Sequence, residues 1–291
     1  MGRYFTPLRY PGGKQKLAPF VEEIMVANGL LKCDYSEPFA GGGGVALSLL
    51  FRDKVGHIHL NDKSYPVFCF WRSVLEEGER FCRLISGATL SVDEWRRQRQ
   101  IISDPGASFL DVGFSVFYLN RCNRSGILTG GLIGGLAQAG TWKMDARFSR
   151  NELIRRVELI AGLKERISIH NLDAEDYITG HLNSLKSKCL VYCDPPYFNK
   201  ADRLYLNHYH ASDHCSLASV IQTTLRHPWL VSYDAVEDVI QLYLRRTGIS
   251  YSLQYNVSTV YKGSELMYIS DDLSFPSSST LKSLNEALKA G

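Results

Sequence analysis

The chain has 291 residues, of which 45% are hydrophobic and 22% charged, so a sizeable core can form and disordered or collagen-like classes are excluded. No apolar run approaches the roughly 18 residues of a membrane span, and the N-terminus lacks the apolar core of a signal peptide. We therefore expect a cytoplasmic protein that makes no use of a membrane.

The net charge of +3 is distributed unevenly. Residues 72–170 contain 15 Lys and Arg against 11 Asp and Glu, a balance of +4, so the remainder carries −1. This bias is consistent with a polyanion bound near the middle segment, and equally with a solvated face. The seven cysteines include no C-x-x-C pair and mostly lie in apolar segments, which indicates small buried hydrophobes in a reducing compartment.

The first part of the chain predicts a β-turn-α-β unit. A helix is expected over residues 17–30, because its apolar residues recur at helical spacing. A short strand then leads into Glu37-Pro38-Phe39-Ala40 and four glycines, which precede an apolar helix over 45–51. A strand over 56–62 ends in Asp62.

From about residue 64 to 166 the pattern becomes helical, and an insertion is the economical interpretation. Strand patterns resume afterwards, so the sheet is interrupted by the insert. Glu265 begins the second strand of the last pair. The helices expected in the insert cover 66–86, 92–103, 107–121 and 150–164, and the later strands cover 167–170, 189–193, 229–233, 249–260 and 264–270.

The glycine run lies between a strand and a helix. Glycines at Gly41 and Gly43 allow the backbone to approach a nucleotide-like ligand closely, and the helix start directs amide groups toward it. Asp62 ends the next strand 21 residues beyond Gly41, where an acid accepts from ribose hydroxyls. The spacing fits an adenosine-containing cofactor, although Gly41-x-Gly43-x-x-Ala46 also satisfies the nicotinamide-dinucleotide pattern.

The turn Asp194-Pro195-Pro196-Tyr197 follows the apolar strand over 189–193. A carboxylate and a proline carbonyl accept hydrogen bonds from an exocyclic amine, and tyrosine stacks on a flat ring. The two prolines stiffen the turn. This set is suited to holding a planar ring that bears an amine, although the tetrapeptide alone is also consistent with a rigid turn that ends a strand.

Together with Tyr10-Pro11-Gly12-Gly13-Lys14 and Tyr118-Leu119-Asn120-Arg121, these motifs resemble the Dam-like, class D12 family of DNA adenine N6-methyltransferases. The motifs occur in the family's order over roughly residues 5–270. The resemblance implies a Rossmann-like α/β methyltransferase sheet with an inserted, mainly helical target-recognition domain. The expected domains are a discontinuous catalytic domain (1–71 and 166–275), the recognition insert (72–165) and a C-terminal tail (276–291).

The resemblance implies transfer of a methyl group from S-adenosylmethionine to the exocyclic amine of a flipped-out adenine in double-stranded DNA, leaving S-adenosylhomocysteine. The residues that it places in catalysis are Asp194, Pro195, Pro196 and Tyr197. Those that it places around the cofactor are Tyr10, Gly13, Lys14, Glu37, Pro38, Phe39, Gly41, Gly43, Asp62, Asp173 and Asp194. Ala174 replaces the family's usual phenylalanine after Asp173, so Asp176 is an alternative contact for the cofactor's adenine, and a buried capping aspartate is the structural alternative for either acid.

Arginines suit guanine edges and phosphates, and asparagine suits adenine edges. The insert and the N-terminal segment therefore supply the DNA-binding candidates, which are Arg9, Asn120, Arg121, Asn123, Arg124, Lys143 and Arg147. A Gly-rich stretch over 129–142 is expected to form an ordered loop against DNA. Thr129 stands about where the family's best-known GATC methylases have an arginine, so a GATC target does not follow.

Other interpretations of these motifs remain open. The turn at 194–197 also fits amine methylation of RNA, and the fold could persist as a DNA-binding or regulatory module without turnover. His208, His210, His214 and Cys215 have loose metal-ligand spacing, but a thiolate-rich set is missing and no metal is expected. A restriction-modification, phage or mobile-element setting would make a cognate restriction or defence component the protein partner, which the sequence does not identify.

Overall fold

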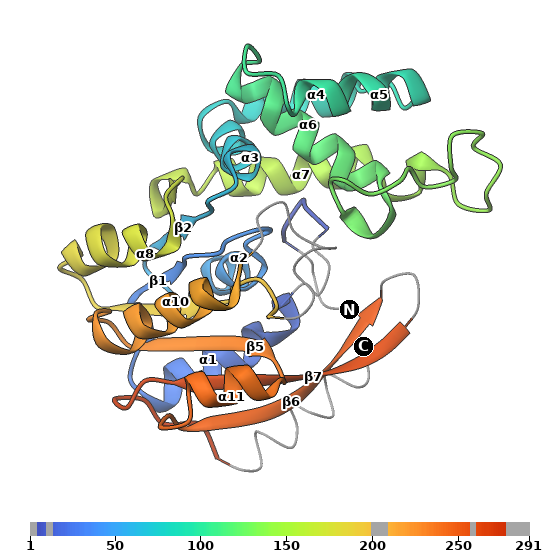
Figure 1. Ribbon diagram of the computed structural model, residues 1–291. Helices are drawn as coiled ribbons and strands as arrows, with labels where there is room; N and C mark the ends of the chain where they lie inside the picture. The colour runs from blue at the N-terminus through green and yellow to red at the C-terminus, as the bar shows by residue number, and fades with distance from the viewer. Residues whose placement is uncertain (1–4, 10–13, 199–208, 257–259, 278–291) are drawn as a thin grey trace. The chain divides into compact units, whose positions relative to one another are not determined.

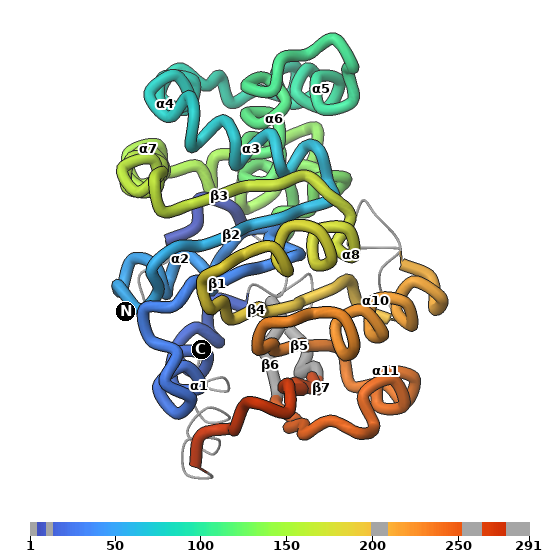
Figure 2. The backbone as a smooth tube through the Cα atoms, turned by 90° about the vertical axis from the view of Figure 1, so that its left-hand side faces the viewer, coloured from blue at the N-terminus to red at the C-terminus, as the bar shows by residue number. Residues whose placement is uncertain are grey.

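The computed structural model describes residues 5–9, 14–198, 209–256 and 260–277 (Figures 1 and 2). The chain forms two compact units. One contains Met1–Pro11 and Ser64–Ile169, and the other contains Gly12–Lys63 and His170–Gly291. We call them the helical unit and the sheet unit. Within the described ranges, no helix is long and apolar enough to cross a membrane.

A seven-stranded sheet has the order β3-β2-β1-β4-β5-β7-β6. β1, β2, β4 and β5 pair in parallel, and β7 pairs antiparallel with both β5 and β6. β1 lies beside both β2 and β4, so the strand order reverses there and ligands are expected outside the carboxyl ends of these strands. The strands are β1 (Asp34–Glu37), β2 (Ile58–Asn61), β3 (Ile167–His170), β4 (Cys189–Cys193), β5 (Trp229–Asp234), β6 (Gly248–Asn256) and β7 (Val260–Ile269).

Helices cover both faces of this sheet, as Figure 2 shows. Side chains alternate across a strand, so Cys189, Val191 and Cys193 of β4 share one face. These three residues belong to a buried cluster with Leu217 of α10 and Val239 of α11. The helical elements of the sheet unit are η1 (Lys14–Leu17), α1 (Ala18–Ala27), α2 (Gly44–Phe51), α8 (Ala174–Asp176), η5 (Tyr177–His181), η6 (Leu182–Ser184), α10 (Ala211–Thr223) and α11 (Glu237–Leu242).

The helical unit is built around α6, whose residues from Leu110 to Cys122 are, except Asp111, buried. Gly113 of α6 allows close packing on α3, because a Cβ at this position would lie 2.5 Å from the backbone oxygen of Cys69. Phe81 and Phe117 pack edge to face, with ring centroids 5.5 Å apart. The elements are α3 (Tyr65–Glu76), α4 (Gly78–Gly87), α5 (Val92–Ile101), α6 (Phe109–Cys122), η2 (Arg124–Gly126), η3 (Met144–Arg147), α7 (Arg150–Ala161) and η4 (Lys164–Arg166).

The expected α/β class with a helical insert is confirmed, and three details differ. The single helix expected over 66–86 is two helices that meet at Glu77. Helices α10 and α11 were not predicted. The first eleven residues join the helical unit, which also extends to residues 64 and 169 instead of 72 and 165. Most of the tail expected at 276–291 lies outside the described residues.

The last two strands also differ in their bounds from the sequence prediction. β6 ends at Asn256 and β7 already begins at Val260. Glu265 therefore lies in the middle of β7, paired across the sheet with Tyr251 of β6 and Asp234 of β5. This register brings an acidic side chain beside the residues that follow β4, as described below.

Candidate active site and nucleic-acid interface

The turn Asp194-Pro195-Pro196-Tyr197 directly follows β4, at the carboxyl end of the parallel strands. Its prolines and Tyr197 are buried, whereas the side chain of Asp194 is 28% exposed. The turn thus has a rigid, covered backbone and one partly accessible carboxylate. That is the arrangement expected where a ligand meets the edge of the sheet.

β5 holds both ends of this turn. The Ser232 hydroxyl donates to Asp194 Oδ1 at 2.8 Å, and the backbone amide of Phe198 donates to Asp234 Oδ1 at 3.0 Å. Ser232 also shares a hydrogen bond of 2.8 Å with the hydroxyl of Tyr192 on β4. Because these partners belong to neighbouring paired strands, the carboxylate of Asp194 has a defined orientation.

Lys14 contributes a buried positive charge to the same place. Its ammonium lies 3.4 Å from Asp194 Oδ1 and forms an ion pair with Glu265. Burial alone would lower the pKa of Lys14, but the two carboxylates raise that pKa well above its ordinary value. Burial raises the pKa of Asp194, while Lys14 acts in the opposite direction. Lys14 therefore stays charged and opposes the rise in the pKa of Asp194 that burial causes.

Glu265 is a site residue that the sequence reasoning did not assign. It is 1% exposed, and its Oε1 accepts from the Tyr197 hydroxyl at 2.9 Å. Its Oε2 accepts from the Tyr251 hydroxyl at 2.6 Å and from Lys14. An acid directly before the apolar run Leu266-Met267-Tyr268-Ile269 could have signalled a buried pair, since an isolated buried charge is costly.

The glycine loop follows β1 as predicted. Gly41 and Gly43 adopt φ angles of 46° and 56°, in the left-handed region that favours glycine. The Gly41 amide donates to Asp62 Oδ2 at 2.9 Å, which ties the loop to the end of β2. Glu37 accepts from the Ala46 amide at 2.9 Å, and so satisfies one of the free amides at the start of α2.

Glu37 is buried, with 6% of its surface exposed. Burial raises the pKa of its carboxyl group to about 8, although the Ala46 amide and the Tyr35 hydroxyl act to lower it. The Tyr35 hydroxyl donates to Glu37 Oε1 at 3.2 Å. Near neutral pH, this acid is therefore mostly protonated in the ligand-free protein.

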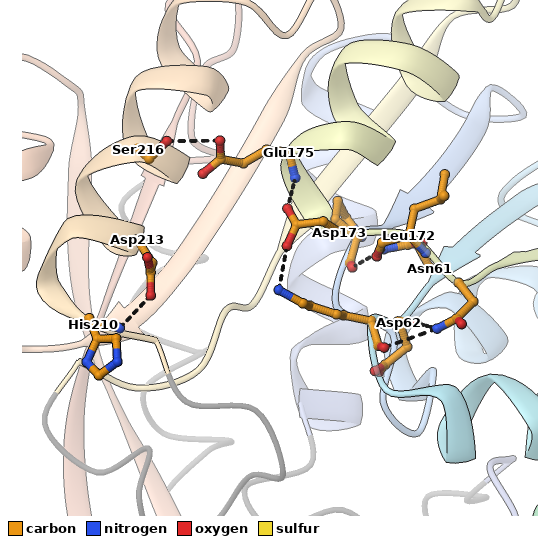
Figure 3. A network of polar contacts seen from close by, with 11 residues as sticks. Asn61, Asp62, Leu172, Asp173, Glu175, His210, Asp213 and Ser216 are labelled. Atoms are coloured by element: carbon orange, nitrogen blue, oxygen red, sulfur yellow. Dashed lines mark hydrogen bonds and ion pairs between the residues drawn. The ribbon is translucent and has the colours of Figure 1, made fainter. Parts of the chain in front are cut away.

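Asn61 is a second residue that the sequence reasoning missed. Its amide donates to the Pro38 and Leu172 carbonyls at 3.0 and 3.1 Å, and its Oδ1 accepts from the Leu172 amide at 3.0 Å. It is fully buried. Asn61 therefore links the glycine loop to the segment that follows β3, which is where Asp173 lies (Figure 3).

Asp173 acts as an N-cap and accepts from the Glu175 amide at 2.9 Å through Oδ1. Its Oδ2 forms an ion pair of 2.9 Å with Lys63. Figure 3 shows this carboxylate between the end of β2 and α8. Asp176 lies within α8 with its side chain exposed. Asp173 and Asp176 are the two acids considered for the cofactor's adenine. Asp173 is the one that lies next to Leu172, which Asn61 links to the glycine loop, and it also caps α8.

Three of the residues predicted to bind DNA have internal partners. Asn120 accepts from the Arg9 amide at 2.6 Å and donates to the Arg9 carbonyl at 2.7 Å. Arg121 donates to the Pro7 carbonyl, and burial lowers the pKa of this arginine to about 9. Asn123 is fully buried and accepts from Trp95 Nε1 at 2.7 Å. These side chains hold the helical unit together, and their contact with DNA stays a prediction.

The other candidates are more accessible. Arg124, Lys143 and Arg147 are exposed, and Arg9 is half-buried with its guanidinium donating to the Asn123 carbonyl at 3.2 Å. Trp142, beside Lys143, is 69% exposed. This part of the helical unit therefore presents positive charge and an aromatic side chain to solvent.

The Gly-rich stretch is an ordered loop. Gln138 donates to the Ile133 and Gly135 carbonyls at 2.8 and 2.6 Å and accepts from the Met144 amide at 3.0 Å. The side chain of Gln138 thus connects backbone groups that precede and follow it in the loop. Trp142 and Leu136 project from this fixed frame with exposures of 69% and 58%.

The histidine cluster has structural contacts where it is described. The backbone amide of His210 donates to Asp213 at 2.7 Å, and His214 Nδ1 lies 3.0 Å from the Tyr233 hydroxyl. Within the described part of the chain, no group of three or more His, Cys, Asp or Glu could hold a metal ion. His208, and the cofactor candidates Tyr10 and Gly13, lie outside the described residues.

Residues 10–257 match the sequence model of the D12 class N6 adenine-specific DNA methyltransferases. The match spans most of the chain, so this protein belongs to that family and is an adenine-specific DNA methyltransferase. The resemblance drawn from the motifs is thereby confirmed. No curated protein matches the chain in sequence.

Solved structures with a related arrangement include two methyltransferases. One is described as an RNA methyltransferase from Pyrococcus horikoshii, with a TM-score of 0.40, 8% identity, and coverage of 86% of this chain and 81% of the other. The rRNA methyltransferase AviRa from Streptomyces viridochromogenes has a TM-score of 0.39, 13% identity, and coverage of 97% and 89%.

If Asn123 is structural, Asn123→Ala will destabilise the protein. The substitution leaves the Trp95 indole and two backbone carbonyls without their partner, so we expect a loss of about 2 kcal/mol in the free energy of unfolding. Urea unfolding measures this loss. Arg124→Ala is the neighbouring exposed control and should change stability by less than about 0.5 kcal/mol. Unchanged stability of Asn123→Ala together with weaker DNA binding would restore the recognition role.

If a cationic cofactor binds beside Glu37, we expect its binding to release protons from this carboxyl group. A positive charge near this carboxyl lowers its pKa from about 8, so at pH 7.5 the bound form holds fewer protons than the free form. Calorimetry with S-adenosylmethionine in buffers of different ionisation enthalpy measures this release. We expect the release to be smaller in Glu37→Gln. Equal proton release by the two proteins would contradict the assignment.

Proposed function

We propose that S-adenosylmethionine binds outside the carboxyl ends of β1, β2 and β4 in the sheet unit. The residues that would hold it are Lys14, the loop from Glu37 to Gly43, Asp62, Asp173 and Asp194. The proposal is supported by the charge of the site. Lys14 carries one positive charge against the two carboxylates of Asp194 and Glu265, so a cationic ligand suits this environment.

The glycine loop also fits this cofactor. The left-handed Gly41 and Gly43 bring the backbone to the start of α2 without side chains in the way. Asp62 ends β2, where a carboxylate accepts from ribose hydroxyls. Its contact with the Gly41 amide uses Oδ2, and a carboxylate has further acceptor positions. Asp173 likewise retains acceptor capacity beyond its capping contact.

When bound, S-adenosylmethionine supplies an electrophilic methyl group. The protein must then present the adenine amine, which is a poor nucleophile because its lone pair is delocalised into the ring. Hydrogen bonds from the amine to Asp194 and to the Pro195 carbonyl would favour a pyramidal nitrogen and release that lone pair. In the described residues, Ser232 and Lys14 both contact Oδ1 of Asp194, which leaves Oδ2 for the amine.

No strong base is required before attack, because the amine becomes acidic only after methylation. Asp194 would then accept the proton or pass it to water. Most of the acceleration should come from positioning, which contributes about 7 to 11 kcal/mol in well-oriented reactions. An adenine inside a duplex cannot reach such a site, so it must flip out at a cost of a few kcal/mol. Stacking on Tyr197 would offset part of this cost.

We assign DNA contact to the exposed side of the helical unit. Arg124, Lys143 and Arg147 would neutralise phosphates, and the loop that presents Trp142 and Leu136 would contact the groove or the opened base pair. Double-stranded DNA, a cytoplasmic location and a restriction or defence partner all stay predictions. The family match favours DNA over the RNA alternative.

Asp194→Ala should abolish adenine methylation, because it removes the acceptor that orients the amine. Expression in a methylation-deficient host, followed by modification-sensitive sequencing, maps N6-methyladenine and reveals the target sequence. Glu79→Ala, an exposed acid of the helical unit, is the control and should retain the wild-type methylation pattern. An active Asp194→Ala variant would refute this catalytic role. A wild-type protein that neither methylates DNA nor binds S-adenosylmethionine would instead support a binding module without turnover.

Lys143→Ala should weaken DNA binding similarly for all sequences, because a phosphate contact carries no sequence information. The slope of log K against log salt concentration should fall in magnitude by about one. Fluorescence anisotropy over a range of salt concentrations measures both quantities. Arg83→Ala, an exposed arginine of α4, serves as the matched control and should leave the slope unchanged. An unchanged slope for Lys143→Ala would remove this lysine from the interface.

A further inference from the structure

The hydroxyl of Tyr197 is bound by a residue from the last strand of the sheet. Glu265 of β7 accepts this hydrogen bond at 2.9 Å, and its other oxygen accepts from Tyr251 at 2.6 Å and from Lys14. Three donors thus converge on one carboxylate that is 1% exposed. A charged acceptor buried this deeply holds its donors in a fixed geometry.

The geometry points to Glu265 as a positioning residue that anchors the Tyr197 side chain, and so its ring, for the flipped base. The turn is already held by two contacts, from Ser232 to the Asp194 carboxylate and from the Phe198 backbone amide to Asp234. Neither contact involves the Tyr197 side chain. Its ring is buried, and the bond from its hydroxyl to Glu265 anchors the far end of the ring, so the side chain is in place before the base arrives.

Lys14 makes this arrangement possible. A buried carboxylate is costly without a counter-charge, and the Lys14 ammonium supplies one while lying 5.6 Å from the centre of the Tyr197 ring. The ammonium also contacts Asp194 at 3.4 Å. Lys14 therefore links Glu265, which holds the Tyr197 side chain, to Asp194, which would orient the amine.

Tyr197→Phe tests the tether with little other disturbance, because it retains the ring and removes only the hydroxyl. We expect kcat to fall about tenfold at saturating cofactor and DNA, with the dissociation constant for S-adenosylmethionine unchanged. The fluorescence of 2-aminopurine at the target position should rise, since a less ordered ring quenches a flipped base less. Tyr243→Phe is the matched control: its hydroxyl is buried without a partner among the described residues, and kcat should be unaffected.

The pairing with Glu265 is tested by a double-mutant cycle. Glu265→Ala should lower kcat at least as much as Tyr197→Phe, because it also removes the partner of Lys14, and the double variant should be no slower than Glu265→Ala alone. Glu265→Gln, which keeps a hydrogen-bonding group, should recover part of kcat. Additive losses in the cycle, or wild-type kcat and fluorescence in Tyr197→Phe, would overturn the proposal. If Glu265→Ala does not fold, Tyr197→Phe and Glu265→Gln decide the question.

This inference rests on the proposed use of Tyr197 as the base-stacking ring. The wild-type protein in the same assay separates the two ideas. An inactive wild type would overturn both the stacking role and the tether. An active wild type, with Asp194→Ala inactive and Tyr197→Phe unchanged, would overturn the tether and leave the proposed reaction intact.

Discussion

The buried carboxylate of Glu265 is the interaction on which the rest of the active site depends. It joins three parts of the chain that are far apart in sequence, through Lys14 near the N-terminus, Tyr197 after β4 and Tyr251 on β6. Burying an acid this deeply requires donors on all sides, and the three partners provide them. The antiparallel strands β6 and β7 therefore complete the sheet and also place the carboxylate of Glu265 in the candidate site.

Strand β5 also holds the turn at Asp194 in place. Ser232 and Asp234 are two residues apart and share one face, from which they hold Asp194 and the amide of Phe198. Val231 and Tyr233 belong to the cluster packed with α10 and α11 on the other face. A single strand thus transmits the rigidity of the core to the turn at Asp194, which we propose meets the substrate. This explains how a turn after a strand can hold a precise geometry.

The fold class was predictable, and the motifs of the candidate site could be recognised, because short motifs carry their chemistry locally. The glycine loop, Asp62 and the turn at Asp194 each combine a backbone requirement with a functional side chain. Glu265 and Asn61 were not predictable in the same way, because each depends on a partner more than 100 residues away in sequence, Lys14 for Glu265 and Leu172 for Asn61. The positions of both residues depend on the register of strand pairing, and a single sequence does not reveal that register.

Asn120, Arg121 and Asn123 show the converse case. Their side chains are of the types that read DNA, but the sequence could not show that backbone carbonyls and an indole would use those groups internally. Helices α10 and α11 were missed for a related reason. Polar residues at the start of α10 obscured the apolar face formed by Leu217, Ala218 and Ile221, which only the neighbouring sheet makes evident.

The division of the chain has a consequence for exchanging target specificity between family members. Residues 6–9 are bound by the insert itself, through contacts from Asn120, Arg121 and Arg156 to backbone groups of Thr6, Pro7 and Arg9. A transplant limited to the contiguous segment 64–169 would separate these partners and leave buried polar groups unmatched. A chimera that carries the first eleven residues together with the insert keeps the unit whole, so the natural module for engineering is discontinuous.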